Sequence, residues 1–138
     1  MEKKIDSFGQ IDYWLLENGI LEFRLAEGLS KAQMLSLDEV LFTQQLQQRL
    51  YQERKEKLRV LARLDSISSM SKEAKNFART DEGLSLNKIT MAYALLAPNL
   101  ITRMLGSVLV RIYGQDYPIK LFTNREQAIE WLLSLSED

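Results

Sequence analysis

The run from Ile89 to Leu96 limits the possible folds most, because it is almost continuously apolar. A strand with such a run has no polar face to turn toward water, so it must be covered on both sides. In α/β proteins helices provide this cover. The run therefore predicts a strand in the interior of a sheet, with helices packed on both faces of that sheet.

Two strand-like runs, residues 13–17 and 20–25, flank the pair Asn18-Gly19. An Asn-Gly pair between such runs predicts a tight hairpin, since both residues accept positive φ. In the second run, apolar residues alternate with Glu22 and Arg24. This alternation predicts a half-buried strand whose charged side chains lie on the face opposite the apolar ones.

Helical and strand-like segments alternate in the rest of the chain. Capping signals open two of the helices, S-x-x-E at Ser36 and N-x-x-Q at Asn124. The predicted elements are a helix over 37–56, a strand over 58–64, a helix over 72–79 closed by Asp81-Glu82-Gly83, the strand over 89–96, a helix over 99–114, a strand over 118–122 and a helix after 124. This order predicts an α/β fold, a mixed sheet of four or five strands with about four helices packed on it.

The length of 138 residues is typical of one domain. We expect a single domain over 13–135, with an N-terminal tail over 1–12 and a C-terminal tail over 136–138. A domain of this length buries roughly two-thirds of its unfolded surface, so it needs no disulfide or metal to fold. Its core is predicted to include Leu61, Ala92, Ala94, Leu105, Phe122 and Trp131.

The sequence contains no cysteine and no histidine. Thiol nucleophiles and thiolate metal sites are therefore absent, and so are the commonest general base and the commonest metal ligand. A Ser-His-Asp triad cannot be built, and neither glycine-rich phosphate-binding motif occurs. We expect no catalytic residues, no metal, no organic cofactor and no enzymatic activity.

The charges nearly cancel, with 18 basic and 19 acidic residues. This balance gives no overall field that would attract nucleic acid, so we expect no nucleic-acid partner. The first residues lack the apolar core of a signal peptide, and no apolar run reaches the roughly 20 residues of a membrane helix. We expect a cytoplasmic protein without membrane insertion. The broad apolar stripe over 100–113 suits either the core or a homodimer.

Three stretches, residues 61–74, 92–96 and 121–132, resemble the STAS domains of anti-sigma-factor antagonists. The chain resembles uncharacterised bacterial STAS/SEC14-like proteins more closely, over about residues 13–133. The resemblance implies a STAS-like fold and a non-enzymatic function, and it leaves two classes open. The first is a regulatory protein-interaction module with an unidentified protein partner, switched by phosphorylation. The second is a small-ligand or lipid-binding domain of SEC14-like character.

The resemblance also draws attention to the serines before the helix over 72–79. In the anti-sigma antagonists, a serine at the start of the equivalent helix is phosphorylated within an Asp-Ser-Ser/Thr-Gly motif. Here Asp65-Ser66 begins similarly, but Ile67-Ser68 follows and no glycine appears. Ser69 and Ser71 are the candidate residues, either as phosphorylation sites or as a simple helix cap.

Overall fold

The computed structural model describes residues 2–29, 34–63, 70–97, 103–104, 107, 110–111 and 118–135. Its centre is a six-stranded sheet in which the strands follow one another in sequence order. The strands are β1 (Lys3–Phe8), β2 (Ile11–Leu15), β3 (Leu21–Leu25), β4 (Leu58–Arg63), β5 (Thr90–Leu96) and β6 (Ile119–Phe122). The pairs β1/β2 and β2/β3 are antiparallel, whereas β3/β4, β4/β5 and β5/β6 are parallel.

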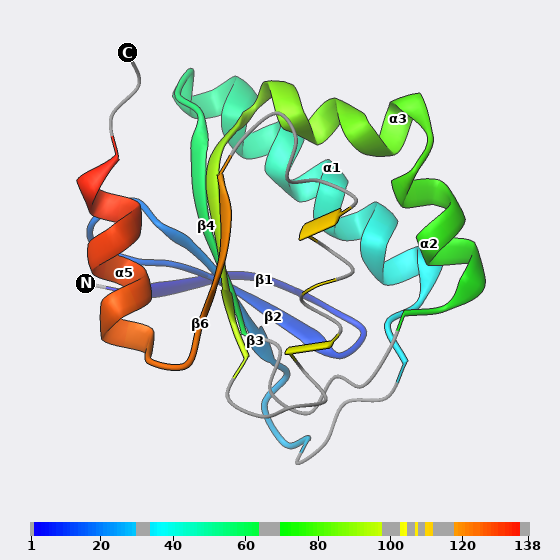
Figure 1. The fold of residues 1–138 in the computed structure, drawn as a ribbon, viewed down its shortest axis with the longest axis horizontal. Helices are drawn as coiled ribbons and strands as arrows, with labels where there is room; N and C mark the ends of the chain where they lie inside the picture. The colour runs from blue at the N-terminus through cyan, green and yellow to red at the C-terminus, as the bar shows by residue number, and fades with distance from the viewer. Residues whose placement is uncertain are drawn as a thin grey trace.

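Helices lie on both faces of this sheet (Figure 1). One face carries α1 (Leu37–Arg54), α2 (Lys72–Ala78), α3 (Asp81–Leu84) and a short 3₁₀ helix, η1 (Ser85–Lys88). The other face carries α5 (Arg125–Ser134), which packs on β4, β5 and β6. The described residues between 103 and 111 are also helical. The predicted mixed α/β architecture is thus confirmed.

The apolar run that begins at Ile89 forms β5, with parallel neighbours on both sides. Leu95 packs in the core cluster on the α1 face, and Ala92, Ala94 and Leu96 pack in the cluster on the α5 face. Burial on both faces explains why this strand needs no polar residues on either side.

The sheet has six strands, so the prediction of four or five was too low. The missed strand is β1, in the segment expected to be a tail over 1–12. The expectation of a tail is wrong for this segment, because β1 pairs along β2, which itself begins at Ile11. In the sequence of β1, Lys-Lys-Ile-Asp-Ser-Phe, four of the six residues are polar. Edge strands commonly carry such charges, which leave little apolar periodicity to detect.

The predicted hairpin connects β2 and β3, but its turn is longer than the expected two residues. The Leu16 N–H donates to the Ile20 carbonyl at 2.9 Å, and the Gly19 N–H donates to the Leu16 carbonyl at 2.9 Å. These bonds enclose a three-residue loop in which Gly19 alone has a positive φ, 87°. Such a loop places its glycine in the left-handed region after an ordinary turn.

Both capping predictions are confirmed. The Ser36 hydroxyl accepts from the Glu39 N–H at 3.2 Å, and the Glu39 carboxylate accepts from the Ser36 N–H at 3.0 Å. At the start of α5, Asn124 Oδ1 accepts from the Gln127 N–H at 3.0 Å. These short-range hydrogen bonds set where each helix begins, which is why the sequence pattern locates them.

Asp81, Glu82 and Gly83 open a new helix, α3, instead of closing the previous unit as predicted. The Thr80 hydroxyl caps α3 by accepting from the Gly83 N–H at 3.1 Å. Gly83 lies so close to α2 that a Cβ atom there would be 2.2 Å from the Phe77 carbonyl oxygen. The glycine therefore allows two helices to approach closely, a role that no local sequence signal distinguishes from a helix end.

The predicted core residues divide into three groups. Leu61, Ala92 and Ala94 are fully buried, as predicted. Phe122 and Trp131 are half-buried and pack on the α5-side cluster, with ring centroids 5.5 Å apart. Leu105 lies outside the described residues, and so does most of the apolar stripe over 100–113. Within that stripe, the described Met104 is 65% exposed.

Candidate functional site

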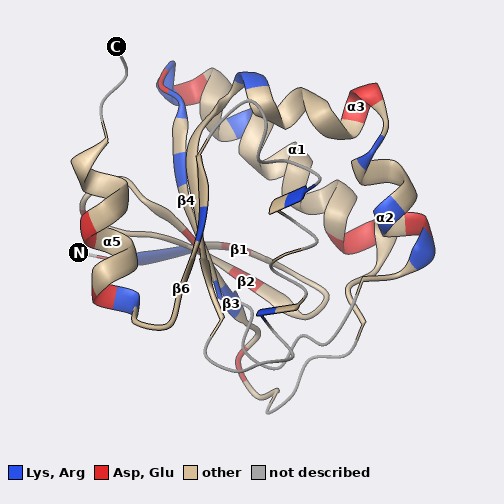
Figure 2. Ribbon diagram, viewed as in Figure 1, with Lys and Arg blue, Asp and Glu red and all other residues tan. Residues whose placement is uncertain are grey.

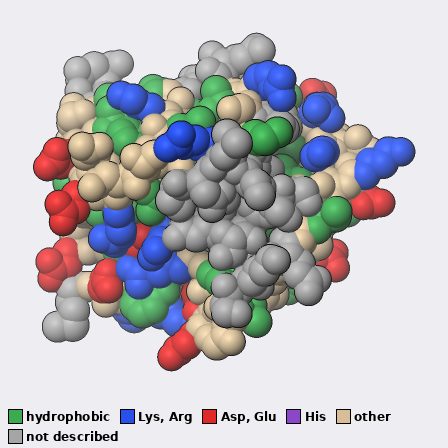
Figure 3. All heavy atoms as spheres, turned by 60° about the horizontal axis from the view of Figure 1, so that its bottom comes forward, with side chains coloured by type: hydrophobic (Ala, Val, Ile, Leu, Met, Phe, Trp, Pro, Cys, Tyr) green, Lys and Arg blue, Asp and Glu red, His purple; other side chains and the backbone are tan. Residues whose placement is uncertain are grey.

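The structure has two candidate functional regions: the start of α2, which the sequence already indicates, and a charged cluster on the opposite face of the sheet. Strands β3 to β6 run parallel, so their carboxyl ends share one edge of the sheet. In open α/β sheets, ligands bind outside the carboxyl ends of the strands. Figure 3 brings this edge forward and shows Lys and Arg side chains on both sides of the view.

Ser71 is the N-cap residue of α2, and its hydroxyl accepts from the Ala74 N–H at 3.0 Å. Its own N–H donates to the Leu35 carbonyl at 2.8 Å, which ties the start of α2 to the segment before α1. The hydroxyl of Ser71 therefore has a structural task as a helix cap. Ser69, the second candidate, lies outside the described residues.

The buried side of α2 packs in a small apolar cluster. Met70 and Ala74 are buried and pack against the half-buried Leu35 and Val40. The outward face of α2 is polar and exposed, at Lys72, Glu73, Asn76 and Arg79. Figure 2 shows both signs of charge along α2 and α3. The result is a firmly seated helix that presents charged side chains to solvent.

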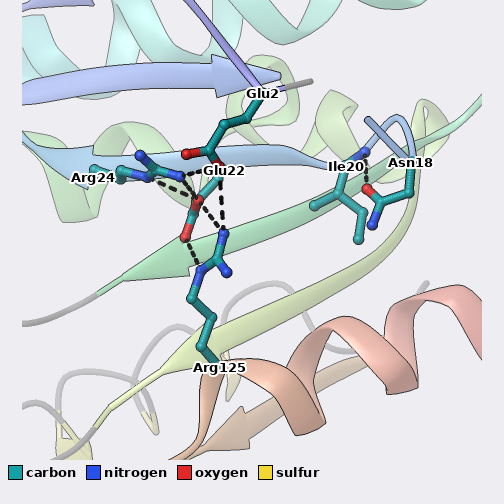
Figure 4. Close-up of polar contacts among 6 residues, drawn as sticks. All are labelled: Glu2, Asn18, Ile20, Glu22, Arg24 and Arg125. Carbon is teal, nitrogen blue, oxygen red and sulfur yellow. Dashed lines mark hydrogen bonds and ion pairs between the residues drawn. The ribbon is translucent and has the colours of Figure 1, made fainter. Parts of the chain in front are cut away.

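On the opposite face, the Glu22 side chain is completely buried. Its carboxylate forms a bidentate ion pair with Arg125, with Nε to Oε2 at 2.9 Å and Nη2 to Oε1 at 3.0 Å. The neighbouring Arg24 donates from Nε to Glu22 Oε1 at 2.8 Å. Figure 4 shows the carboxylate between the two guanidinium groups. A buried charge must be paired in this way, because burial without a partner is strongly unfavourable.

Two further side chains complete this cluster. The exposed carboxylate of Glu2 contacts Arg24 Nη2 at 2.9 Å and Arg125 Nη2 at 4.0 Å (Figure 4). On its other side, Arg24 lies over the ring of Trp14, 4.3 Å from the ring centroid. The stacked ring and the two carboxylates hold the Arg24 guanidinium in one orientation.

The protonation states in this cluster follow from its contacts. Burial works to raise the pKa of Glu22, but the hydrogen bonds and charges of Arg125 and Arg24 outweigh it and hold the pKa below its usual value. The hydrogen bonds with Glu22 likewise raise the pKa of Arg125. Glu22 is therefore ionised at neutral pH, so it is unsuited to donate a proton as a general acid.

The sequence pattern did not reveal this cluster. Alternation correctly placed Glu22 on the face opposite Leu21 and Phe23 but predicted that this face would be open to solvent. At Glu22 this face is instead covered by the side chain of Arg125, the first residue of α5, which lies 103 positions away in the chain. Nothing local to either residue indicates the pairing.

A family model matches residues 13–136 and describes a domain of unknown function (DUF7793). The chain belongs to the DUF7793 family. The match covers every strand except β1 and the first residues of β2, along with all of the described helices. No curated protein matches this DUF7793 chain.

A crystal structure from Shewanella loihica PV-4 has a similar fold. It is an uncharacterized protein from the DUF3478 family, described as having a SpoIIAA-like fold. The two chains are 15% identical, with a TM-score of 0.63 over 88% of this chain and 91% of the other. The likeness supports the predicted STAS-like architecture at the level of the fold.

Two features are absent from the described part of the chain. No group of three or more acidic side chains there could hold a metal ion. No helix there is long and apolar enough to cross a membrane.

Proposed function

We propose that this DUF7793 domain is a non-enzymatic protein-interaction module of the STAS type, which binds its partner through the exposed face of α2. The observation that carries the proposal is that α2, in a fold similar to a SpoIIAA-like one, is anchored on one side and exposed on the other. The helix follows β4 at the carboxyl edge of the sheet, is anchored through Ser71 and Met70, and has a free polar face. Such a rigid, exposed element can bind a partner without rearrangement of the domain.

The residue types available support a binding function over catalysis. Without histidine or cysteine, general base catalysis would fall to carboxylates. The two buried glutamates in the described part of the chain have structural roles: Glu22 pairs with two arginines, and Glu39 caps α1 and accepts from the Gln10 N–H at 2.8 Å. These contacts hold the pKa of each carboxyl group below its usual value, which makes each carboxylate a weaker proton acceptor.

The regulatory part of the proposal concerns Ser69 and Ser71. A phosphate at the start of α2 would lie near Lys72 and Lys75 and would add about two negative charges to the binding face. The unmodified Ser71 hydroxyl already has a role in the fold, because it caps α2. Phosphopeptide mapping of protein from its native cells tests this part, and unmodified serines under all growth conditions would leave capping as the role.

Charge reversal on α2 tests the binding face. The double variant Lys72→Glu, Arg79→Glu changes two exposed residues of the helix and its C-cap. The matched control, Lys57→Glu with Lys88→Glu, changes two exposed residues that precede β4 and β5 at the opposite edge of the sheet. We expect a partner captured by the wild type to be lost from the α2 variant and retained by the control. Equal retention by both variants would refute the assignment to α2.

The second class is a small-ligand or lipid-binding domain. Analysis of the purified wild-type protein for a bound small molecule distinguishes this class from the interaction module. A small molecule that copurifies in stoichiometric amount, while no protein partner depends on the α2 face, would favour that class over the interaction module.

A further inference from the structure

The charged cluster on the α5 face lies where the cover of the sheet ends. Helix α5 packs on β4, β5 and β6. Leu61 of β4 lies in the apolar core cluster between α5 and the sheet. The next strand, β3, places Glu22 beside Leu61, and β2 places Trp14 beside Glu22. Charged and aromatic side chains therefore take over at β3, where the packing of α5 on the sheet ends.

The donors of the two arginines are incompletely used. Arg125 donates to Glu22 through Nε and Nη2, whereas Arg24 donates to Glu22 through Nε and to Glu2 through Nη2. Within the part of the chain that the structure describes, neither Nη1 group has a hydrogen-bond partner. A guanidinium group has five N–H donors in a planar fork suited to a carboxylate. The pair thus retains donors after Glu22 is satisfied.

Without Glu2, the positive charges in this cluster outnumber the negative ones. Two guanidinium groups face one buried carboxylate, and both oxygens of Glu22 already accept hydrogen bonds from them. The remaining positive charge is compensated by Glu2, which is about half exposed and bridges the outer side of both arginines. Arg125 is moreover the first residue of α5, where the helix dipole adds positive potential.

We propose that Arg24 and Arg125 form a binding site for a carboxylate of an acidic segment in a partner protein, and that Glu2 is an internal competitor for this site. The occupant seen in the structure, a carboxylate from the chain itself, indicates the chemistry that the site accepts. Glu22 and Trp14 keep the guanidinium of Arg24 in position, so little ordering is needed when the external carboxylate replaces Glu2. The site is on the opposite face from α2 and is independent of the binding proposed there.

Removal of the competitor tests the proposal. The probe is a blocked acidic peptide, acetyl-Gly-Glu-Gly-Glu-Gly-amide, titrated while NMR follows the Trp14 indole and the Nε–H groups of Arg24 and Arg125. We expect Glu2→Gln to bind the peptide at least about threefold more tightly than the wild type. In this variant no carboxylate at position 2 competes with the peptide for Arg24 and Arg125. Binding should disappear at about 1 M salt, where the screening length is about 3 Å.

Two controls make the result specific. Glu126→Gln removes an exposed carboxylate from the same first turn of α5 and should leave peptide affinity within about twofold of the wild type. Arg125→Lys keeps the positive charge beside Glu22 but loses the fork, and should weaken binding while circular dichroism remains native. The α2 variant Lys72→Glu, Arg79→Glu should bind the peptide normally, so failure here and failure of the α2 proposal are distinguishable.

Equal peptide affinity in Glu2→Gln and the wild type would overturn the proposal. Binding of inorganic phosphate without binding of the peptide would overturn the assigned class of partner.

Discussion

Glu22 shows how a charge is accommodated inside this fold. Its carboxylate is fully buried, and within the described part of the chain its hydrogen bonds come from Arg24 and Arg125. We expect Glu22→Gln to lower the free energy of unfolding by about 3–5 kcal/mol, because two arginines lose their buried partner. Urea denaturation measures this loss. The exposed Glu2→Gln should lose less than about 1 kcal/mol, and similar losses in both variants would contradict the account.

The same residue predicts a dependence on pH. Because the pKa of Glu22 is lower in the folded protein than in the unfolded chain, its contribution is present above the unfolded value. The contribution is lost as the pH falls through the folded value. The difference in unfolding free energy between wild type and Glu22→Gln should therefore be constant near neutral pH and shrink below about pH 4.

Tyr13 provides the opposite case. It is fully buried, its hydroxyl lies 2.6 Å from the Thr43 hydroxyl, and burial raises its pKa from 10.0 to about 12. Above pH 10 the unfolded chain loses this proton before the folded protein does, so stability falls as the pH rises from 10 toward 12. We expect Tyr13→Phe to lose about 1 kcal/mol at neutral pH and to decline less steeply in alkali. Parallel alkaline curves for the two proteins would refute the raised pKa.

At the scale of elements, the contact between α2 and α3 depends on Gly83. A Cβ atom at this position would lie 2.2 Å from the Phe77 carbonyl oxygen and 2.9 Å from Ala78 Cα. Gly83→Ala should therefore lower the free energy of unfolding by about 3 kcal/mol, since the backbone of one helix must move. Gly28 is the control, because its φ is +90° but nothing lies within 4 Å. Gly28→Ala should lose about 1 kcal/mol from backbone strain alone. Equal losses would contradict the packing role of Gly83.

The start of α2 makes a separate prediction. Ser71→Ala removes the acceptor for the Ala74 N–H and should lose about 1 kcal/mol in thermal or chemical denaturation. Ser71→Asp should retain most of the stability, because aspartate is an effective cap. If Ser71→Ala proves as stable as the wild type, the hydroxyl has no capping role of this size.

These elements also show what the sequence could predict. The caps at Ser36 and Asn124 depend on residues three positions apart, so a local pattern located both helices. The buried strand β5 was recognisable because two covered faces require a continuous apolar run. Edge strand β1 has no such requirement and was missed. The pairing of Glu22 with Arg125, and the approach of Gly83 to α2, arise from tertiary contacts that no local pattern encodes.

At the scale of the molecule, the two faces of the sheet serve different purposes in this account. Helix α5 is fixed at both ends, by the Glu22–Arg125 ion pair at its start and by Arg59 at its end. Arg59 donates from Nε to the Leu132 carbonyl at 2.9 Å and from Nη2 to the Leu135 carbonyl at 2.7 Å. Helix α2 instead buries one small apolar patch and leaves a charged face open. The fold therefore supplies a rigid support for binding at its surface.

Native mass spectrometry of the protein, isolated gently from its own cells, tests the central claim of a protein-interaction module most directly. The account predicts a complex whose added mass is that of a second, different polypeptide. The Lys72→Glu, Arg79→Glu variant should lack this complex, while the Lys57→Glu, Lys88→Glu control should retain it. A chain that carries a stoichiometric small molecule and no second polypeptide would contradict the claim.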